Sequence, residues 1–328
     1  MPNRGRGGIV KGMQETEETI DMNDNETEGS NIRTPNFKPK TRWWHKWSRL
    51  SRKRKLIISG SIIVVLAAIL IFVLLKPSNK PVAKKVAAPT TIASPLTGEE
   101  VKPGLAARPV TAVMIENSDA ARPQSGLQDA GVVFEAIAEG GITRFMALFQ
   151  EASPQYIGPV RSLRPYYLDY ATGFQASIVH VGGSPDALKT VENGNYRNLD
   201  QFFNGGYFRR ISSRDSPHDV YTSFAQLDKL NKSKGYTKSS FTSWPRKADQ
   251  KLATPTAKTI DLSISGPDFY AHYDYNATTN SYRRSEGGAK HTDLVSSTDK
   301  TGVQLNPKVV IAMVVPLSQG SLDASGAY

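Results

Sequence analysis

The sequence predicts an α/β protein: a mixed β-sheet domain with covering helices plus an incomplete β-rich C-terminal subdomain, preceded by one transmembrane helix. Three observations lead to this fold class. An uncharged apolar run extends from Leu56 to Leu75. Short branched-apolar runs then alternate with helix-type segments between residues 108 and 234, which is typical of a sheet covered by helices. Two further runs near residues 269–284 flank a polar turn and predict a hairpin.

Composition excludes several protein classes. The 328 residues carry 41 Lys and Arg against 30 Asp and Glu, a net charge of +11, and no cysteine. A disulfide-stapled miniprotein, thiol catalysis, iron–sulfur ligation and a lipidated cysteine are therefore excluded. The sequence also contains no P-loop, G-x-G-x-x-G or zinc signature, so we expect no cofactor and no metal.

The apolar run at residues 56–75 predicts a membrane-spanning helix. At about 1.5 Å per residue, twenty residues reach roughly 30 Å, the thickness of the hydrocarbon core. Seven Lys and Arg lie in residues 41–55 and four in residues 76–90, which places the N-terminus in the cytoplasm and the C-terminal domain outside. The alternative for the RKRK run at residues 52–55 is a nuclear signal or a nucleic-acid patch. We expect a single-pass protein of the cell membrane.

The chain on either side of this span divides into four parts. Residues 1–55 are polar and basic with few apolar side chains, which predicts a disordered cytoplasmic tail. Residues 76–92 are rich in Pro, Ala and Lys, which is typical of an extended linker. We expect an N-terminal domain at 93–240 and a C-terminal part at 255–328, with the boundary in the Lys, Ser and Thr-rich stretch near 235–258.

The predicted elements follow in order along the outer part. The strand predictions are residues 108–117, 131–138, 142–150 and 176–181, then a hairpin of 269–275 with 281–284, and a buried strand at 308–315. The helix predictions are residues 162–172, a helix from Ser184 to about Asn193, and 223–234. Ser184 followed by Pro185 and Asp186 has the residue order of a helix N-cap, so we interpret Ser184 as structural and not as a nucleophile.

Six ordered motifs resemble the YerB-like family of bacterial extracytoplasmic lipoproteins. They are PLTGEEV at 95–101, RPVTAVMIEN at 108–117, ARPQSGL at 121–127, EGGITRF at 139–145, IGPVRSLRPYYLD at 157–169 and HVGGSPDAL at 180–188. The resemblance covers roughly residues 93–225, and residues 282–315 resemble the start of that family's C-terminal part. The chain lacks the family's lipobox cysteine, and its C-terminal part is shorter than the family's. The resemblance implies an architecture and an extracytoplasmic location, but no reaction, because the family is of unknown function.

Arginines supply the main functional indication. Nine of the ten basic residues between Ala106 and Asp215 are Arg, whereas Lys predominates after Ser216. The guanidinium fork matches carboxylate and phosphate groups. The predicted ligand-binding residues are Arg122, Arg144, Arg161 and Arg164, with the neighbouring Glu116, Asn117, Gln124, Ser125, Thr143 and His180. The alternative is that the arginines form internal ion pairs with Glu116, Asp129, Glu135, Glu139 and Asp169.

We therefore expect a protein that binds an anionic envelope polymer, such as peptidoglycan or a wall polymer, or another envelope protein, as an accessory or scaffold factor. The sequence favours a binding protein over an enzyme. One alternative is a glycan hydrolase that uses Glu135 and Glu139, although four residues along a strand span about 13 Å, which is too far for the pair. A second is extracellular nucleic-acid binding through the aromatics of residues 202–208 beside Arg209 and Arg210, which we consider the weaker interpretation. His272 with Asp274, and His291 with Asp293, are expected to be surface pairs and not metal ligands.

Overall fold

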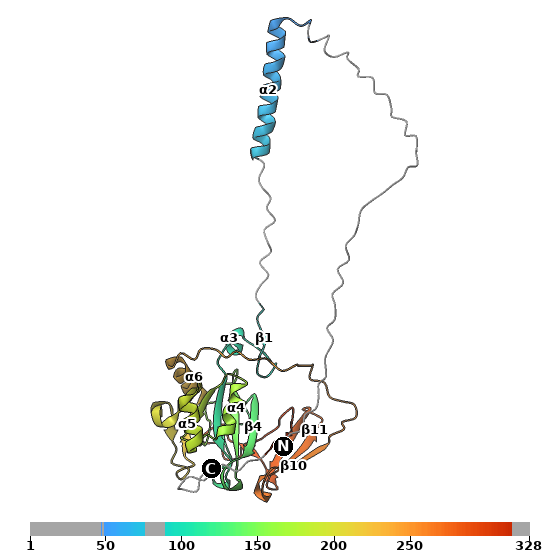
Figure 1. Cartoon of the computed structure of the whole chain (residues 1–328). Coiled ribbons are helices and arrows are strands. Elements are labelled where there is room, and N and C mark those ends of the chain that lie inside the picture. The colour runs from blue at the N-terminus through green and yellow to red at the C-terminus, as the bar shows by residue number, and fades with distance from the viewer. Residues whose placement is uncertain (1–46, 48, 76–88, 317–328) are drawn as a thin grey trace, which may run out of the picture. The chain divides into compact units, whose positions relative to one another are not determined.

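A computed structural model describes Trp47, residues 49–75 and residues 89–316 (Figure 1). The chain divides into two compact units, Met1–Lys85 and Val86–Tyr328, which we describe separately. The predicted tail up to residue 46 and most of the predicted linker, residues 76–88, lie outside the described residues.

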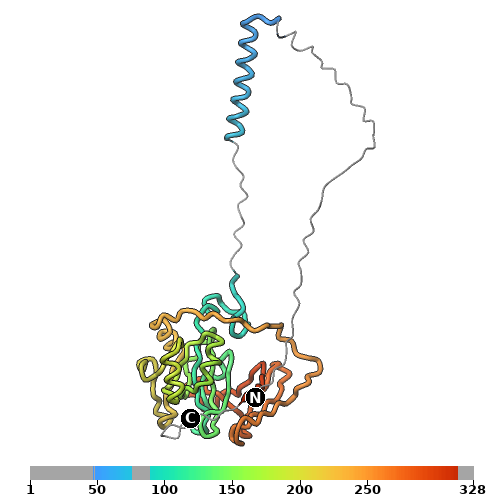
Figure 2. The backbone as a smooth tube through the Cα atoms, viewed as in Figure 1, coloured from blue at the N-terminus to red at the C-terminus, as the bar shows by residue number. Residues whose placement is uncertain are grey.

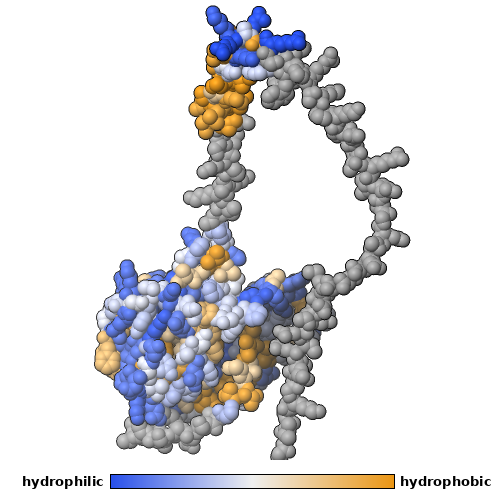
Figure 3. All heavy atoms as spheres, turned by 45° about the horizontal axis from the view of Figure 1, so that its top comes forward, coloured by the Kyte–Doolittle hydropathy of each residue, from blue (hydrophilic) through white to orange (hydrophobic). Residues whose placement is uncertain are grey.

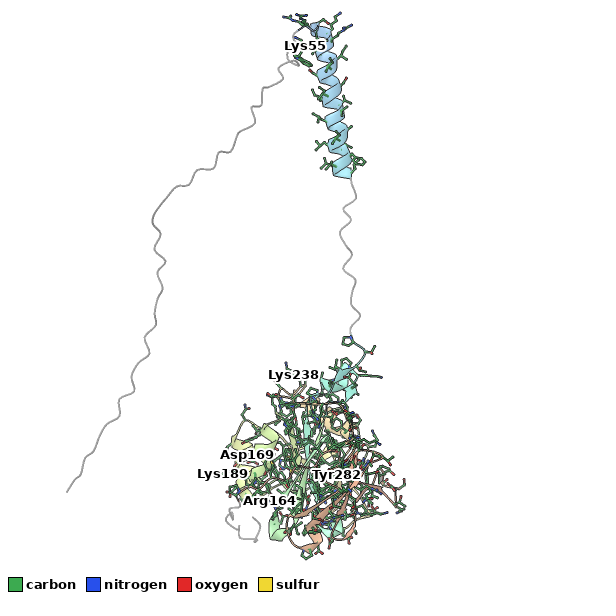
Figure 4. The ribbon with its side chains drawn as sticks, turned by 90° about the vertical axis from the view of Figure 1, so that its right-hand side faces the viewer. Lys55, Arg164, Asp169, Lys189, Lys238 and Tyr282 are labelled. Atoms are coloured by element: carbon green, nitrogen blue, oxygen red, sulfur yellow. The ribbon has the colours of Figure 1, made fainter. Side chains whose placement is uncertain are left out.

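The described part of the first unit is one long helix, α2, at Arg52–Leu75. Its apolar side chains project on all sides and none is buried, and the basic residues gather at its start (Figures 3 and 4). The Ser61 hydroxyl donates to the Ile57 carbonyl (2.9 Å), so its polarity is satisfied within the helix. Among the described residues this is the one helix long and apolar enough to cross a membrane, which makes α2 a candidate span.

A five-stranded mixed sheet forms the centre of the second unit, in the order β4-β5-β3-β6-β7. Its strands are β3 at Thr111–Glu116, β4 at Val132–Ile137, β5 at Thr143–Phe149, β6 at Ser177–His180 and β7 at Arg197–Asp200. β4 and β5 pair antiparallel, as do β5 and β3, whereas β3 pairs parallel with β6 and β6 with β7. From β3 the sheet extends to one side through β5 and β4 and to the other side through β6 and β7, so the strand order reverses at β3.

Alternating side chains give this sheet two buried faces. Ala112 and Met114 of β3 point to the face covered by α4 (Pro165–Thr172) and α5 (Pro185–Asn193). Val113 and Ile115 point to the opposite face, where α6 (Phe224–Ser233) packs. The strand period of two thus places apolar residues against both helical layers.

Short flanking elements are β1 Ile92–Ala93, β2 Glu100–Val101, α3 Pro103–Ala106, β8 Arg209–Arg210 and β9 Val220–Tyr221.

The C-terminal part begins after a long connection without helix or strand, which crosses from α6 to β10 (Figure 2). An antiparallel sheet follows in the order β10-β11-β12-β13. Its strands are β10 at Thr259–Ser263, β11 at Tyr270–Asn276, β12 at Ser281–Glu286 and β13 at Ala289–Lys290, with a separate pair of β14 at Thr292–Asp293 and β15 at Val303–Gln304. The predicted hairpin is confirmed as β11 and β12.

The predicted buried strand at residues 308–315 is wrong. The segment has no strand, and its large apolar side chains, among them Val309, Ile311 and Val314, are exposed. The sequence run is apolar enough for a strand, but a strand needs a neighbour for its backbone hydrogen bonds, and no described strand pairs with this segment.

The C-terminal part and the central sheet form one compact unit, because buried polar groups join them. The Asp293 carboxylate of β14 accepts backbone N–H bonds from Gly126 (2.9 Å), Leu127 (3.1 Å) and Gln128 (3.1 Å). Burial outweighs these bonds and raises the pKa of Asp293 to about 6. Asp293 is thus buried, and not the surface residue that the sequence predicted.

Candidate functional site

The two parallel strands β3 and β6 separate at their carboxyl ends. Their pairing stops at Val113 and Val179, and the segment after Pro159 lies between the strands beyond that point. There the Arg161 amide donates to the Met114 carbonyl (2.9 Å), and the Arg161 carbonyl accepts from the Val181 amide (3.1 Å). Open α/β sheets bind ligands at such a position, where the strand order reverses.

Three ionisable side chains meet at this edge. Glu116, the last residue of β3, is buried and accepts a bond from the Ser118 hydroxyl (2.9 Å). Its Oε2 lies 2.9 Å from His218 Nδ1 and 3.3 Å from Arg161 Nε. A carboxylate can only accept, so the Nδ1–H of His218 donates to it. The sequence predicted Glu116 and Arg161 as site residues, and the structure places them together.

Polar atoms of this group remain available for a ligand. The side chains of Arg161 and His218 are 23% and 22% exposed. Within the described residues, neither Nη atom of Arg161 has a hydrogen-bond partner, and neither does Nε2 of His218. A guanidinium edge and an imidazole nitrogen are thus available beside one buried carboxylate. We call Glu116, Arg161 and His218 the edge site.

Two exposed aromatic rings lie at the same end of the sheet. Phe202 and Phe203 lie in the 3-10 turn Gln201–Phe203 that follows β7, and they are 69% and 76% exposed. The Phe202 ring lies over Gly182, where an added Cβ would come within 2.8 Å of it. Gly182 also has a φ of +55°, which favours glycine, and its carbonyl accepts from the Leu163 amide (3.0 Å). The Asp200 carboxylate fixes this turn by accepting from the Gly182 and Phe202 amides, each at 3.1 Å.

Arg144 and Arg164 instead form a buried ion-pair cluster with Glu139. Arg144, which is 1% exposed, binds Glu139 Oε1 at 2.5 Å, and Arg164 binds Oε2 at 2.6 Å. Burial would raise the pKa of Glu139, but the charge and hydrogen bond of Arg144, together with Arg164, lower it to about 2. The alternative of internal pairing therefore describes these two arginines, and the four predicted arginines do not converge on one site.

Glu135 joins a buried network with the C-terminal part. Arg284 Nη2 of β12 donates to Glu135 Oε2 (2.9 Å) and to Glu286 Oε1 (3.0 Å). Thr143 Oγ1 donates to Glu135 Oε1 (2.8 Å), and Asn117 Nδ2 donates to Glu286 Oε1 (2.8 Å). Burial and the nearby Glu286 charge raise the pKa of Glu135 to about 7, although Arg284 opposes this.

Arg122, Gln124 and His291 complete the network. Arg122 Nε donates to Asn117 Oδ1 (3.1 Å), and its Nη1 donates to the Asp268 carbonyl (3.0 Å).

His291 Nε2 donates to Gln124 Oε1 (2.9 Å), while its Nδ1 accepts from the Arg284 guanidinium (2.9 Å). Burial and the charges of Arg284 and Arg122 hold the pKa of His291 well below its usual range. His291 is therefore a buried neutral bridge, and not the predicted surface residue, whereas His272 lies at the surface between Asp261 and Asp274 as expected.

The contacts of the remaining predicted residues serve the fold. His180 is fully buried, with Nδ1 2.8 Å from the Gly182 carbonyl and Nε2 2.9 Å from Asn198 Oδ1, which leaves neither ring nitrogen for a ligand. Ser125 is buried and its amide donates to the Gly158 carbonyl (2.8 Å). Ser184 caps α5 by accepting from the Ala187 amide (3.4 Å), which confirms the N-cap prediction.

The two carboxylates of the hydrolase alternative bind different partners. Glu139 pairs with Arg144 and Arg164, whereas Glu135 lies beside Glu286. A general acid must carry a proton, but Glu139, with a pKa of about 2, stays ionised at neutral pH. Glu135 holds protons more readily, but it is enclosed in the network, so the geometry does not favour this alternative.

Sequence reasoning missed His218. The residue lies in a loop, residues 214–219, whose Arg, Asp, Ser, Pro and His composition is typical of a functional loop. Its partner Glu116 is 102 positions away in the chain, so no local spacing indicated the pair. The network residues Arg284 and Glu286 were missed for the same reason.

Comparison with known proteins agrees with this architecture. Residues 96–237 match the family described as protein of unknown function (DUF3048), N-terminal domain. A protein of Bacillus subtilis (strain 168) described as "Putative lipoprotein YerB" is 38% identical over 220 residues, which is 64% of this chain and 66% of the relative, just under two thirds of its length. The crystal structure of YerB protein from Bacillus subtilis matches with a TM-score of 0.53 and 35% identity, over 62% of this chain and 69% of that one. The chain therefore belongs to the YerB-like family, a family of unknown function.

Proposed function

We propose that this chain is a single-pass, membrane-anchored envelope protein whose outer unit binds an anionic wall glycan at the edge site. The membrane part of the proposal rests on α2, which is apolar on all sides and has basic residues at its start. The description of the Bacillus relative as a lipoprotein supports an envelope location, since a spanning helix here would replace a lipid anchor.

The observation that carries the binding proposal is the pair of unpartnered Nη atoms on Arg161. A guanidinium edge of this kind donates two parallel hydrogen bonds to a phosphate or carboxylate. Arg161 is held in place by its Nε contact with the buried Glu116, so little freedom is lost when it binds. The other three predicted arginines are engaged with protein partners, which makes Arg161 the arginine that serves the ligand.

The exposed rings of Phe202 and Phe203 support a glycan as the carrier of the anion. A sugar ring has an apolar face, and exposed aromatic rings remove such faces from water. An isolated exposed Phe is common, but two adjacent ones after β7, at the same carboxyl edge of the sheet as Arg161, add an apolar surface to that edge. We propose that the rings hold the sugar and that Arg161 holds its charged substituent.

Co-sedimentation with cell walls tests the proposal. Residues 86–328, which form a compact unit, should sediment with purified Bacillus walls, and less so after the anionic wall polymer is removed by acid. Binding should weaken with salt, because exposed charges are screened over about 10 Å at 0.1 M. Arg161→Lys, which keeps the charge and loses the fork, should reduce binding, and so should Phe202→Ala.

The matched control is Arg283→Lys on β12, which changes an exposed arginine outside the edge site. It should bind like the wild type. Equal binding by all variants, or binding that ignores both salt and the anionic polymer, would contradict the proposal.

A further inference from the structure

We propose that the edge site also performs acid–base chemistry, with His218 as the proton-transferring group, and cleaves a phosphodiester bound by Arg161. This inference deepens the proposed function and rests on its ligand-binding geometry. A site that only held an anion would need the arginine alone. The histidine beside it has a structure that anion binding does not explain.

The imidazole of His218 is fixed in one tautomer. Its Nδ1–H donates to Glu116 Oε2 (2.9 Å), and Glu116 is itself buried and held on its other oxygen by the Ser118 hydroxyl (2.9 Å). A carboxylate held in this way orients the ring and stabilises the imidazolium that forms when Nε2 takes a proton. Nε2 has no partner within the described residues, and the side chain is 22% exposed, so a solvent molecule can reach it.

The lone pair on His218 Nε2 determines which kind of group can bind next to it. That lone pair repels an anionic oxygen but accepts a hydrogen bond from water. A water bound there would lie beside an anion held on the Arg161 fork. In a carboxylate ligand the atom between the bound oxygens has no good leaving group, whereas in a phosphodiester it is an electrophilic phosphorus with an alkoxide to lose.

The step balances without any further reactant. His218 Nε2 takes a proton from water, and the water oxygen forms a bond to phosphorus with its electron pair. The bond from phosphorus to the leaving oxygen on the opposite side breaks, that oxygen takes a proton from solvent water, and the imidazolium returns its proton to solvent. The products are a phosphomonoester and an alcohol. Arg161 neutralises the charge that accumulates on the phosphoryl oxygens, and Glu116 is a positioning residue that acts through His218.

Phosphodiester hydrolysis by the full chain in detergent tests this inference. The probes are bis(4-nitrophenyl) phosphate and purified poly(glycerol phosphate). His218→Gln keeps a donor toward Glu116 but cannot transfer a proton, and it should lower kcat by about 10²- to 10⁴-fold while polymer binding persists. Glu116→Gln should lower kcat more than it changes KM. Added imidazole should restore part of the activity of His218→Gly, which a purely structural role would not allow.

His272→Gln is the matched control, because His272 is another carboxylate-paired histidine, bonded to Asp261 at the surface of the C-terminal sheet. It should keep full activity. Absence of turnover on both probes, or turnover that survives His218→Gln, would overturn the inference. Loss of activity in His272→Gln as well would show that the effect is not specific to the edge site and would overturn it too.

The two proposals fail separately. Wall binding without turnover leaves the binding function intact and removes the acid–base role. Turnover of the small diester without polymer binding leaves the acid–base role intact and removes the binding function.

Discussion

Single residues divide into those that hold the fold and those that face solvent with unused bonding groups. Arg144 and Arg161 have the same chemistry and were predicted from the same pattern. Arg144 is 1% exposed and bound to Glu139, whereas the Nη atoms of Arg161 are free within the described residues. The difference is in long-range packing, so a sequence pattern could propose both residues but could not separate them.

Glu139→Gln should destabilise the outer unit. The substitution removes the charge that compensates two buried guanidinium groups. Removing one partner of a buried ion pair costs about 3 to 5 kcal/mol, and the lower end applies because the Glu139 side chain is 26% exposed. Urea unfolding measures the change. Glu192→Gln on the exposed face of α5 is the control, and an equal, small effect of both substitutions would contradict the ion-pair account.

Ser184→Ala should cost about 0.5 to 2 kcal/mol, because the Ala187 amide loses its acceptor. Ser184→Asp should be nearly neutral, since it restores the acceptor and adds charge at the positive end of α5. Thermal unfolding measures both variants. A large loss in the Asp variant would argue against the cap.

At the scale of elements, the sequence predicted most of the central sheet because its signals are local. Periodicity identified β3, β4, β5 and β6, and the Ser-Pro-Asp sequence identified the start of α5. β7, at Arg197–Asp200, was missed because three of its four residues are polar and only two of the four are buried. The segment at 308–315 was misread because its apolar composition does not reveal whether a neighbouring strand exists.

The charges that flank α2 give a topological prediction. Seven cations before the span and four after it predict that protease added to intact cells digests the chain beyond Lys76 and spares the tail before Lys55. Immunoblotting with tags at both ends measures this. Protection of the C-terminal tag would reverse the orientation.

The network between β4 and β12 makes stability depend on pH. The folded pKa of Glu135 is about 7, above the ordinary 4.5, so the stability it contributes is fully present below about 4.5 and is lost as the pH rises through 7. The lowered pKa of His291 acts in the opposite sense below its ordinary 6.5, because the unfolded chain then binds an extra proton. The network also contains Glu286, Arg284 and Tyr273.

The Glu135 contribution is therefore measured as a difference. The unfolding free energy of the wild type minus that of Glu135→Gln should fall as the pH rises from about 4.5 to 7. Denaturant unfolding at several pH values gives this difference. A difference that rises with pH would show that Glu135 is ionised in the folded state.

The whole outer unit depends on polar contacts between its two sequence parts. Asp293→Asn should destabilise the unit by about 1 to 3 kcal/mol at neutral pH, because an amide cannot accept all three N–H bonds from residues 126–128. Denaturant unfolding and limited proteolysis of the connection at residues 235–258 measure the change. Asp274→Asn at the surface is the control, and equal behaviour of the two variants would contradict the joining role.

The sequence predicted a boundary in this connection, whereas both parts belong to one compact unit, and it could not predict how the parts join. The joining contacts, such as Arg284 with Glu135 and His291 with Gln124, link residues 149 and 167 positions apart. Charge patterning within either part contains no information about its partner. The edge site depends on the same kind of distant meeting, because Glu116, Arg161 and His218 come from separate segments.

The central claim is that the anionic wall ligand binds at the carboxyl edge of β3 and β6. Hydrogen exchange of the outer unit, with and without poly(glycerol phosphate), locates the bound surface directly. The account predicts added protection in peptides that contain Arg161, Gly182, Phe202 and His218, and unchanged exchange in the C-terminal sheet. Protection centred instead on the open hollow of about 450 Å³ lined by Ser263, Tyr270 and Gly287, or no protection anywhere, would contradict it.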